Sequence, residues 1–229
     1  MKPLVSLAPM SGDDVHASGM MMAQPMSWPV EHFALIFSMW WVMMAAMMLP
    51  SAAPMILLYA RAAMNAQNMV QPASGSFLAG YLLSWGAFSL AATILQLLLE
   101  QVGLLMPMFM ASQSRWLSAA ILISAGIYQL SPLKNVCLRH CRNPAQFLSS
   151  HFRPGPNGAL RMGLLHGIYC VGCCWLLMVL LFVGGVMNLA WIALLTLMVA
   201  AEKLLPFGRY VSIAAGVACI SWGMVMLFG

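Results

Sequence analysis

Long apolar runs dominate this chain and limit what it can fold into. Of its 229 residues, 62% are hydrophobic and only 7% are charged. A water-soluble domain of this length cannot bury so large a share of apolar side chains, because its surface is large relative to its core. We therefore expect an integral membrane protein without a separate soluble domain.

The runs predict an all-α fold, a polytopic membrane bundle of about six transmembrane helices. Small residues on two of them, such as Gly80 with Ser84 and Ala215 with Gly223, predict close helix packing. Residues 31–229 would form this single helical domain, and residues 1–30 a flexible periplasmic tail rich in Met and containing His16. The expected helices are Phe33 to Tyr59, Phe77 to Leu99, Trp116 to Leu130, Met162 to Met178, Leu189 to Ala201 and Tyr210 to Phe228.

The basic residues predict the orientation of the bundle. The connection at about residues 132–161 holds five basic residues and no acidic one, which by the positive-inside rule places it in the cytoplasm. Counting outwards from it leaves only Lys2 and Arg115 among the basic residues on the other side. Both termini would then lie on the far side of the membrane, which in the inner (cytoplasmic) membrane of a bacterium would be the periplasmic side.

The fourth apolar run, MGLLHGIYCVGCCWLLM, contains the most distinctive residues of the chain. At about 100° per residue, His166, Cys170 and Cys173 share one helical face, with Cys174 at its border. A single Cys in such a helix is explained by packing as a small hydrophobe. Three thiols and an imidazole on one face place donor atoms side by side, which favours a metal site near the middle of the membrane.

A second group of donors, CLRHC, lies in the basic connection: Cys137, His140 and Cys141. In the cytoplasm a disulfide is disfavoured, so this pattern predicts a metal or redox element. The spacing of one helical turn suits a soft ion of low coordination number better than a tetrahedral zinc site. A purely structural role is the alternative.

Methionine is unusually frequent, with 23 residues in the chain. Thioethers are among the ligands that Cu(I) prefers, although unbranched Met also fills irregular gaps in a core. The candidate thioether ligands in the first apolar run are Met43, Met44, Met47 and Met48.

Two further features of the apolar runs lead to expectations. Pro50 and Pro54 should bend the first helix. Glu202 and Lys203 end the fifth run, and they predict an interfacial ion pair with each other, or else a carboxylate that faces an access path.

Several blocks carry a family resemblance. They are MWWVMMAAMMLPSAAPM, GYLLSWGAFSLAATILQ, AGIYQLSPLKNVCLRHCRNPAQFL, RMGLLHGIYCVGCCWLLMVLLFVGGVMN and EKLLPFG. From Trp28 to the C-terminus, the chain resembles a bacterial family of metal-binding integral membrane proteins, in part described as copper chaperones. The resemblance implies an inner-membrane protein that binds copper and helps to deliver it to a copper enzyme. The family's Met-rich helix, CLRHC block and HGIYCVGCCW block correspond to the candidate ligands named above.

The most consistent hypothesis is a Cu(I) chaperone or carrier that is not itself an enzyme. Its expected partners are a recipient copper enzyme or periplasmic copper protein, membrane lipid and, in a homo-oligomer, a second copy of the chain, but no nucleic acid. One alternative is a membrane thiol-disulfide oxidoreductase in which Cys170 and Cys173 form a reversible disulfide. The other is a structural subunit of a membrane complex, with the cysteine face as its interface.

Overall fold

The chain folds as an all-α protein. The computed structural model describes residues 30–67, 73–106, 111–112 and 114–228, so residues 1–29 of the predicted tail, with their Met residues and His16, lie outside the described part. The only strands in that part are Leu105–Met106 (β1) and Ala111–Ser112 (β2), which pair antiparallel. The helices are α2 (Val30–Gln67), α3 (Ser74–Gln101), α4 (Arg115–Leu130), α5 (Pro132–Arg142), α6 (Pro144–His151), α7 (Gly155–Val179), α8 (Leu181–Gly184), α9 (Leu189–Leu204) and α10 (Gly208–Phe228).

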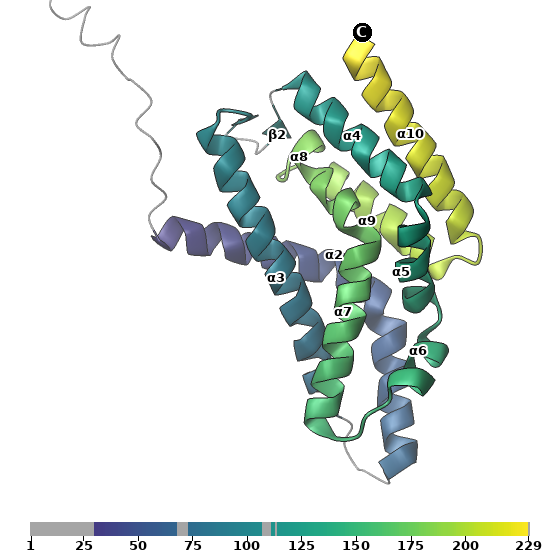
Figure 1. Cartoon of the computed structure of the whole chain (residues 1–229). Helices are drawn as coiled ribbons and strands as arrows, with labels where there is room; N and C mark the ends of the chain where they lie inside the picture. The colour runs from purple at the N-terminus through teal and green to yellow at the C-terminus, as the bar shows by residue number, and fades with distance from the viewer. Residues whose placement is uncertain (1–29, 68–72, 107–110, 113, 229) are drawn as a thin grey trace, which may run out of the picture.

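Helices α3 and α7 form the tightest pair in the centre of the molecule (Figure 1). Glycines let the two backbones touch, because a Cβ on Gly80 would overlap the backbone oxygen of Leu160 and a Cβ on Gly163 that of Phe77. The hydroxyl of Ser84 donates across the same contact to the backbone oxygen of Leu164 at 3.0 Å. The close packing predicted from Gly80 and Ser84 is confirmed.

Helices α4 and α10 form a second pair that lies side by side (Figure 1). Gly126 of α4 faces Gly216 and Ile220 of α10, and Gly223 of α10 packs on Ile123. The small-residue stripe of α10 therefore serves helix packing, as its spacing predicts.

Helix α2 bends near its middle and crosses the other helices (Figure 1). Pro50 and Pro54 lie inside it, where each proline removes a backbone hydrogen bond. On the N-terminal side of the bend, the indole of fully buried Trp40 donates to Gln96 of α3 at 2.8 Å. The bend thus directs the two halves of α2 against different parts of the bundle.

Within the described residues, four helices are long and apolar enough to cross a membrane. Helices α4 and α5 would together make a fifth span if the pair, which is bent by 64°, counts as one. Helix α9 has 16 residues and reaches about 24 Å, which is shorter than a hydrocarbon core of about 30 Å. All six expected segments are helical, but a count of six spanning helices is not confirmed.

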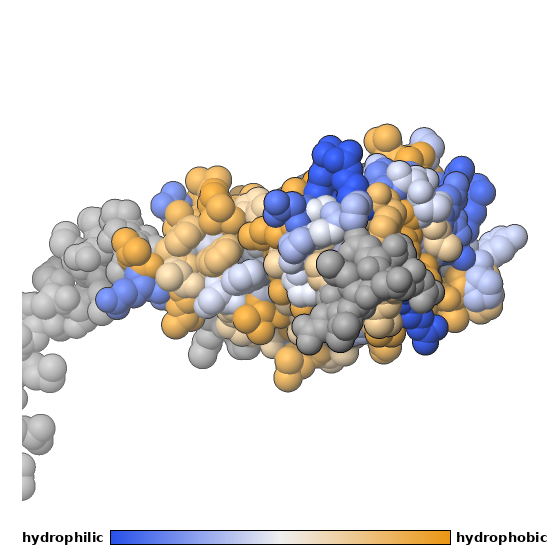
Figure 2. All heavy atoms as spheres, turned by 90° about the horizontal axis from the view of Figure 1, so that it is seen from below, coloured by the Kyte–Doolittle hydropathy of each residue, from blue (hydrophilic) through white to orange (hydrophobic). Residues whose placement is uncertain are grey.

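The basic connection predicted at residues 132–161 is largely helical, since it contains α5, α6 and the first turns of α7. Its arginines line two surface pockets, with Arg139 beside His140 and His151 in one of them and Arg153 beside Arg161 in the other. From below, hydrophilic residues are seen next to broad hydrophobic areas (Figure 2).

Candidate metal centre

The cysteine face of α7 points into the core of the bundle. Cys170, Cys173 and Cys174 are each only 1% exposed. The thiols of Cys173 and Cys174 both donate to the backbone oxygen of Cys170, at 3.1 and 2.9 Å. Because positions i, i+3 and i+4 lie on one helical face, the three thiols occupy one small buried region.

Helix α2 brings a thioether to these thiols. The sulfur of Met48 lies 4.0 Å from Sγ of Cys174. Met44 and Met47 are buried in the same core cluster, and Met43 is partly buried against it. The Met-rich and Cys-rich segments predicted as ligands are therefore neighbours in space, with Met48 in direct contact.

Helix α3 contributes Tyr81, which sequence reasoning missed because the second apolar run shows no donor pattern. Its hydroxyl lies 3.2 Å from Sγ of Cys170 and donates to the backbone oxygen of Met48 at 3.3 Å. Tyr81 is fully buried and thus links α2 to α7 at the thiols.

The CLRHC residues of α5 divide between two environments. Cys141 is partly buried against the core cluster that holds the α7 thiols, and Cys137 packs against Gly172 of α7. His140 turns away, since its ring stacks on Tyr169 at 4.2 Å and its Nδ1 bonds to the backbone oxygen of Val136. The structure thus brings the cysteines of this motif towards α7 but not its histidine.

His166 lies one turn before Cys170 and is 3% exposed. The rings of Phe77, Tyr81 and Phe147 surround its imidazole at centroid distances of 5.5–6.1 Å. Its Nδ1 has no hydrogen-bond partner in the described part of the chain. A buried polar atom without a hydrogen-bond partner is unusual. Nδ1 of His166 is therefore available as a metal ligand.

The donors do not form a complete cage. Among the described residues, no group of three or more His, Cys, Asp or Glu side chains is arranged so that it could hold a metal ion. All six cysteines are free thiols. The structure instead brings the thiols of α7 close to the thioether of Met48.

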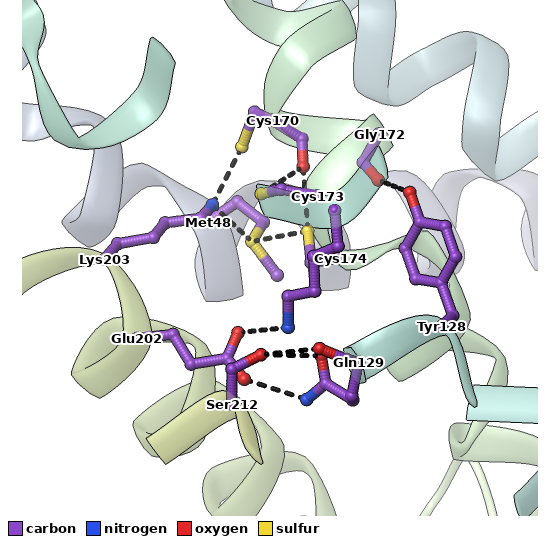
Figure 3. Close-up of polar contacts among 11 residues, drawn as sticks. Met48, Tyr128, Gln129, Cys170, Gly172, Cys173, Cys174, Glu202, Lys203 and Ser212 are labelled. Atoms are coloured by element: carbon purple, nitrogen blue, oxygen red, sulfur yellow. Dashed lines mark hydrogen bonds and ion pairs between the residues drawn. The ribbon is translucent and has the colours of Figure 1, made fainter. Parts of the chain in front are cut away.

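Lys203 of α9 reaches this convergence, as Figure 3 shows. Its ammonium group donates to Sγ of Cys170 at 3.0 Å, to Oγ of Ser51 at 3.4 Å and to the sulfur of Met48 at 3.9 Å. Sequence reasoning misses this role because a Lys at the end of an apolar run has the pattern of an interfacial charge. Only the fold shows that α9 packs against α5 and α7, two of the helices that carry cysteines.

Glu202 does not pair with Lys203, so the predicted interfacial ion pair is wrong. The Glu202 carboxylate binds the ammonium of Lys134 at 2.6 Å and accepts from the amide of Gln129 at 2.8 Å. Ser212 of α10 donates to Gln129 in turn. Adjacent residues on a helix point about 100° apart, so Glu202 and Lys203 face different neighbours, and both are buried.

Fold and site together define a helical protein, compatible with a membrane, whose core gathers the soft donors of cysteine and methionine. The chain belongs to the copper chaperone family PpoB2, whose sequence model matches residues 37–226. This confirms the family resemblance and supports a role connected with copper. No curated protein and no solved structure matches the chain.

Proposed function

We propose that this protein is a Cu(I) chaperone or carrier, which binds the ion at the buried thiols and passes it to a copper-dependent enzyme. The observation that carries the proposal is the approach of Met48 of α2 to the cysteine face of α7. Thiolate and thioether are the soft ligands that select Cu(I). Family membership gives independent support for copper as the cargo.

In this proposal Cys170 with Cys173 or Cys174 provides the primary ligands, and Met48 an additional sulfur. Incomplete ligand sets suit transfer, because the ion must also leave. Bound Cu(I) would offset the negative charge of thiolates in an apolar interior. Weaker ligands on either side of the thiols would be provided by His166, Met43, Met44 and Met47. The path by which the ion reaches the thiols from the cytoplasm would be lined by Cys137, His140 and Cys141.

The setting that we propose is the bacterial inner membrane, crossed about six times with both termini in the periplasm. Helix α9 would be a short span, and the basic segment around α5 and α6 would face the cytoplasm. The membrane-length apolar helices and the arginines that line the pockets of this segment support this arrangement.

The chain itself would catalyse no reaction. We expect its functional partner to be a recipient copper enzyme or a periplasmic copper protein, which takes the ion by ligand exchange. Lipid surrounds the bundle in this proposal, and self-association would be measured by the molar mass of the protein in detergent.

Copper content tests the proposal. The protein, purified in detergent and kept reduced, should retain Cu(I), whereas a variant with Cys170, Cys173 and Cys174 changed to Ser should lose it. Cys219→Ser is the matched control, because Cys219 is a partly buried thiol of α10, which packs chiefly on α4, and its loss should not affect copper. If native and triple variant bind equally little copper while the native thiols form a reversible disulfide, the chaperone proposal fails.

Met48→Leu should weaken Cu(I) binding by about tenfold or more, the range found when groups that support a metal site are removed. The two side chains have similar volumes, so the fold should change little. Affinity would be measured by competition with a chromophoric Cu(I) chelator. Met55→Leu is the control, because Met55 is equally buried but belongs to a separate core cluster. Equal affinities for both variants would remove Met48 from the ligand set.

A further inference from the structure

The ammonium group of Lys203 lies in the thiol cluster, and no carboxylate of the described residues pairs with it. We infer that Lys203 is a charge-selecting residue, which makes the centre favour a monovalent soft cation over a divalent one. This inference rests on the proposed function and deepens it, because it explains how the site would distinguish Cu(I) from divalent thiol-binding ions such as Zn(II).

The surroundings of Lys203 carry the inference. The side chain is 7% exposed and its nearest polar neighbours are Cys170, Ser51 and Met48. Within the described chain, the one ion pair is that of Lys134 with Glu202, so the adjacent carboxylate is already engaged. Of the groups that Lys203 contacts, only the thiol of Cys170 can carry negative charge.

Burial makes this arrangement sensitive to charge. An ammonium group in an apolar interior is strongly unfavourable unless an opposite charge lies beside it. A thiolate at Cys170 provides that charge at 3.0 Å. The second negative charge would come from whichever neighbouring thiol joins Cys170 as a ligand, because a thiol gives up its proton when it binds a metal.

The net charge of the loaded centre then depends on the ion. Two thiolates and one ammonium leave a net charge of about minus one, which a monovalent cation neutralises. A divalent cation would leave an uncompensated positive charge in the same buried volume. Because electrostatic interactions are strong where water is excluded, Lys203 penalises the divalent ion.

The test compares Ag(I) with Cd(II) on the full-length protein in detergent. Both ions are soft and have the same d10 electron configuration, so they differ chiefly in charge. The variants are Lys203→Met and Lys203→Gln, which remove the charge, and Lys203→Arg, which keeps it. Affinities for both ions would be measured by competition with a chelator, and folding by the elution volume and circular dichroism of each variant.

We expect the ratio of Ag(I) to Cd(II) affinity to fall by about 100-fold in the two neutral variants, the effect typical of removing one partner of a buried charge pair. Lys203→Arg should keep the ratio. A folded neutral variant with an unchanged ratio would overturn the inference. So would equal losses of affinity for both ions, which indicate a structural role.

A reference that needs no variant keeps the test decisive if the neutral variants do not fold. Dithiothreitol offers two thiolates without an ammonium group, so the wild-type protein must prefer Ag(I) over Cd(II) more strongly than this dithiol does. A wild-type ratio no larger than that of dithiothreitol would refute the role of Lys203 while leaving copper binding intact. A wild-type protein that binds neither Ag(I) nor Cu(I) would instead refute the proposed function, and this inference with it.

Discussion

Glu202→Ala should destabilise the folded protein by about 3–5 kcal/mol, the range measured when one partner of a buried ion pair is removed. The variant leaves the ammonium of Lys134 fully buried without its carboxylate, and it also removes the acceptor for Gln129. These contacts join α4, α5 and α9, so the loss should affect the whole bundle. Unfolding in detergent with increasing denaturant, followed by circular dichroism, measures the change in free energy.

The double variant Lys134→Met with Glu202→Leu is the informative control. It removes both charges and keeps apolar volume, so it should recover most of the lost stability. A surface-like comparison is Glu100→Ala, since Glu100 is only partly buried and accepts a single hydrogen bond from Gln96. If Glu202→Ala costs no more than Glu100→Ala, the buried pair does not support the fold as we describe it.

Gly163→Ala should also be strongly destabilising, at or above the upper end of the usual cost of about 1–3 kcal/mol for overpacking. The added methyl group would meet the backbone oxygen of Phe77, and a backbone cannot move aside as a flexible side chain can. The substitution must therefore push α3 away from α7 and disturb the contact between Tyr81 and Cys170. Thermal unfolding and the Cu(I) affinity should both report this change.

Gly75→Ala provides the control of opposite sign. Gly75 lies in the first turn of α3, and a Cβ there would meet no atom within 4 Å. Alanine has the higher helix propensity, so this variant should stabilise the protein by up to about 1 kcal/mol. Similar effects at the two positions would contradict the close packing of α3 on α7.

Much of the fold could be predicted from the sequence, because apolar runs and their polar breaks fix where helices begin and end. The expected helix Tyr210 to Phe228 is observed as Gly208–Phe228, and the run Met162 to Met178 lies within Gly155–Val179. The shared face of Cys170 and Cys173 follows from helical geometry alone. These features depend on local sequence, which a single chain displays.

The charged residues show where sequence reasoning ends. In the sequence, Lys134 belongs to the basic connection, whereas Glu202 and Lys203 look like an interfacial pair, so sequence neighbours suggest the wrong pairing. Only the packing of α5 and α9 shows that Glu202 belongs with Lys134, which leaves Lys203 for the thiols. The orientation of His140 is hidden in the sequence for a similar reason. Its ring stacks on that of Tyr169, so it points away from the thiols that Cys137 and Cys141 approach.

The deep burial of the three α7 thiols also has a kinetic consequence. With each of them only 1% exposed, a chelator in solution cannot reach an ion bound there in the resting conformation. The rate of exchange is then set by how often the surrounding helices separate, and it does not rise with chelator concentration once every opening leads to capture. A recipient that pulls these helices apart as it docks would accelerate release without binding the ion more tightly.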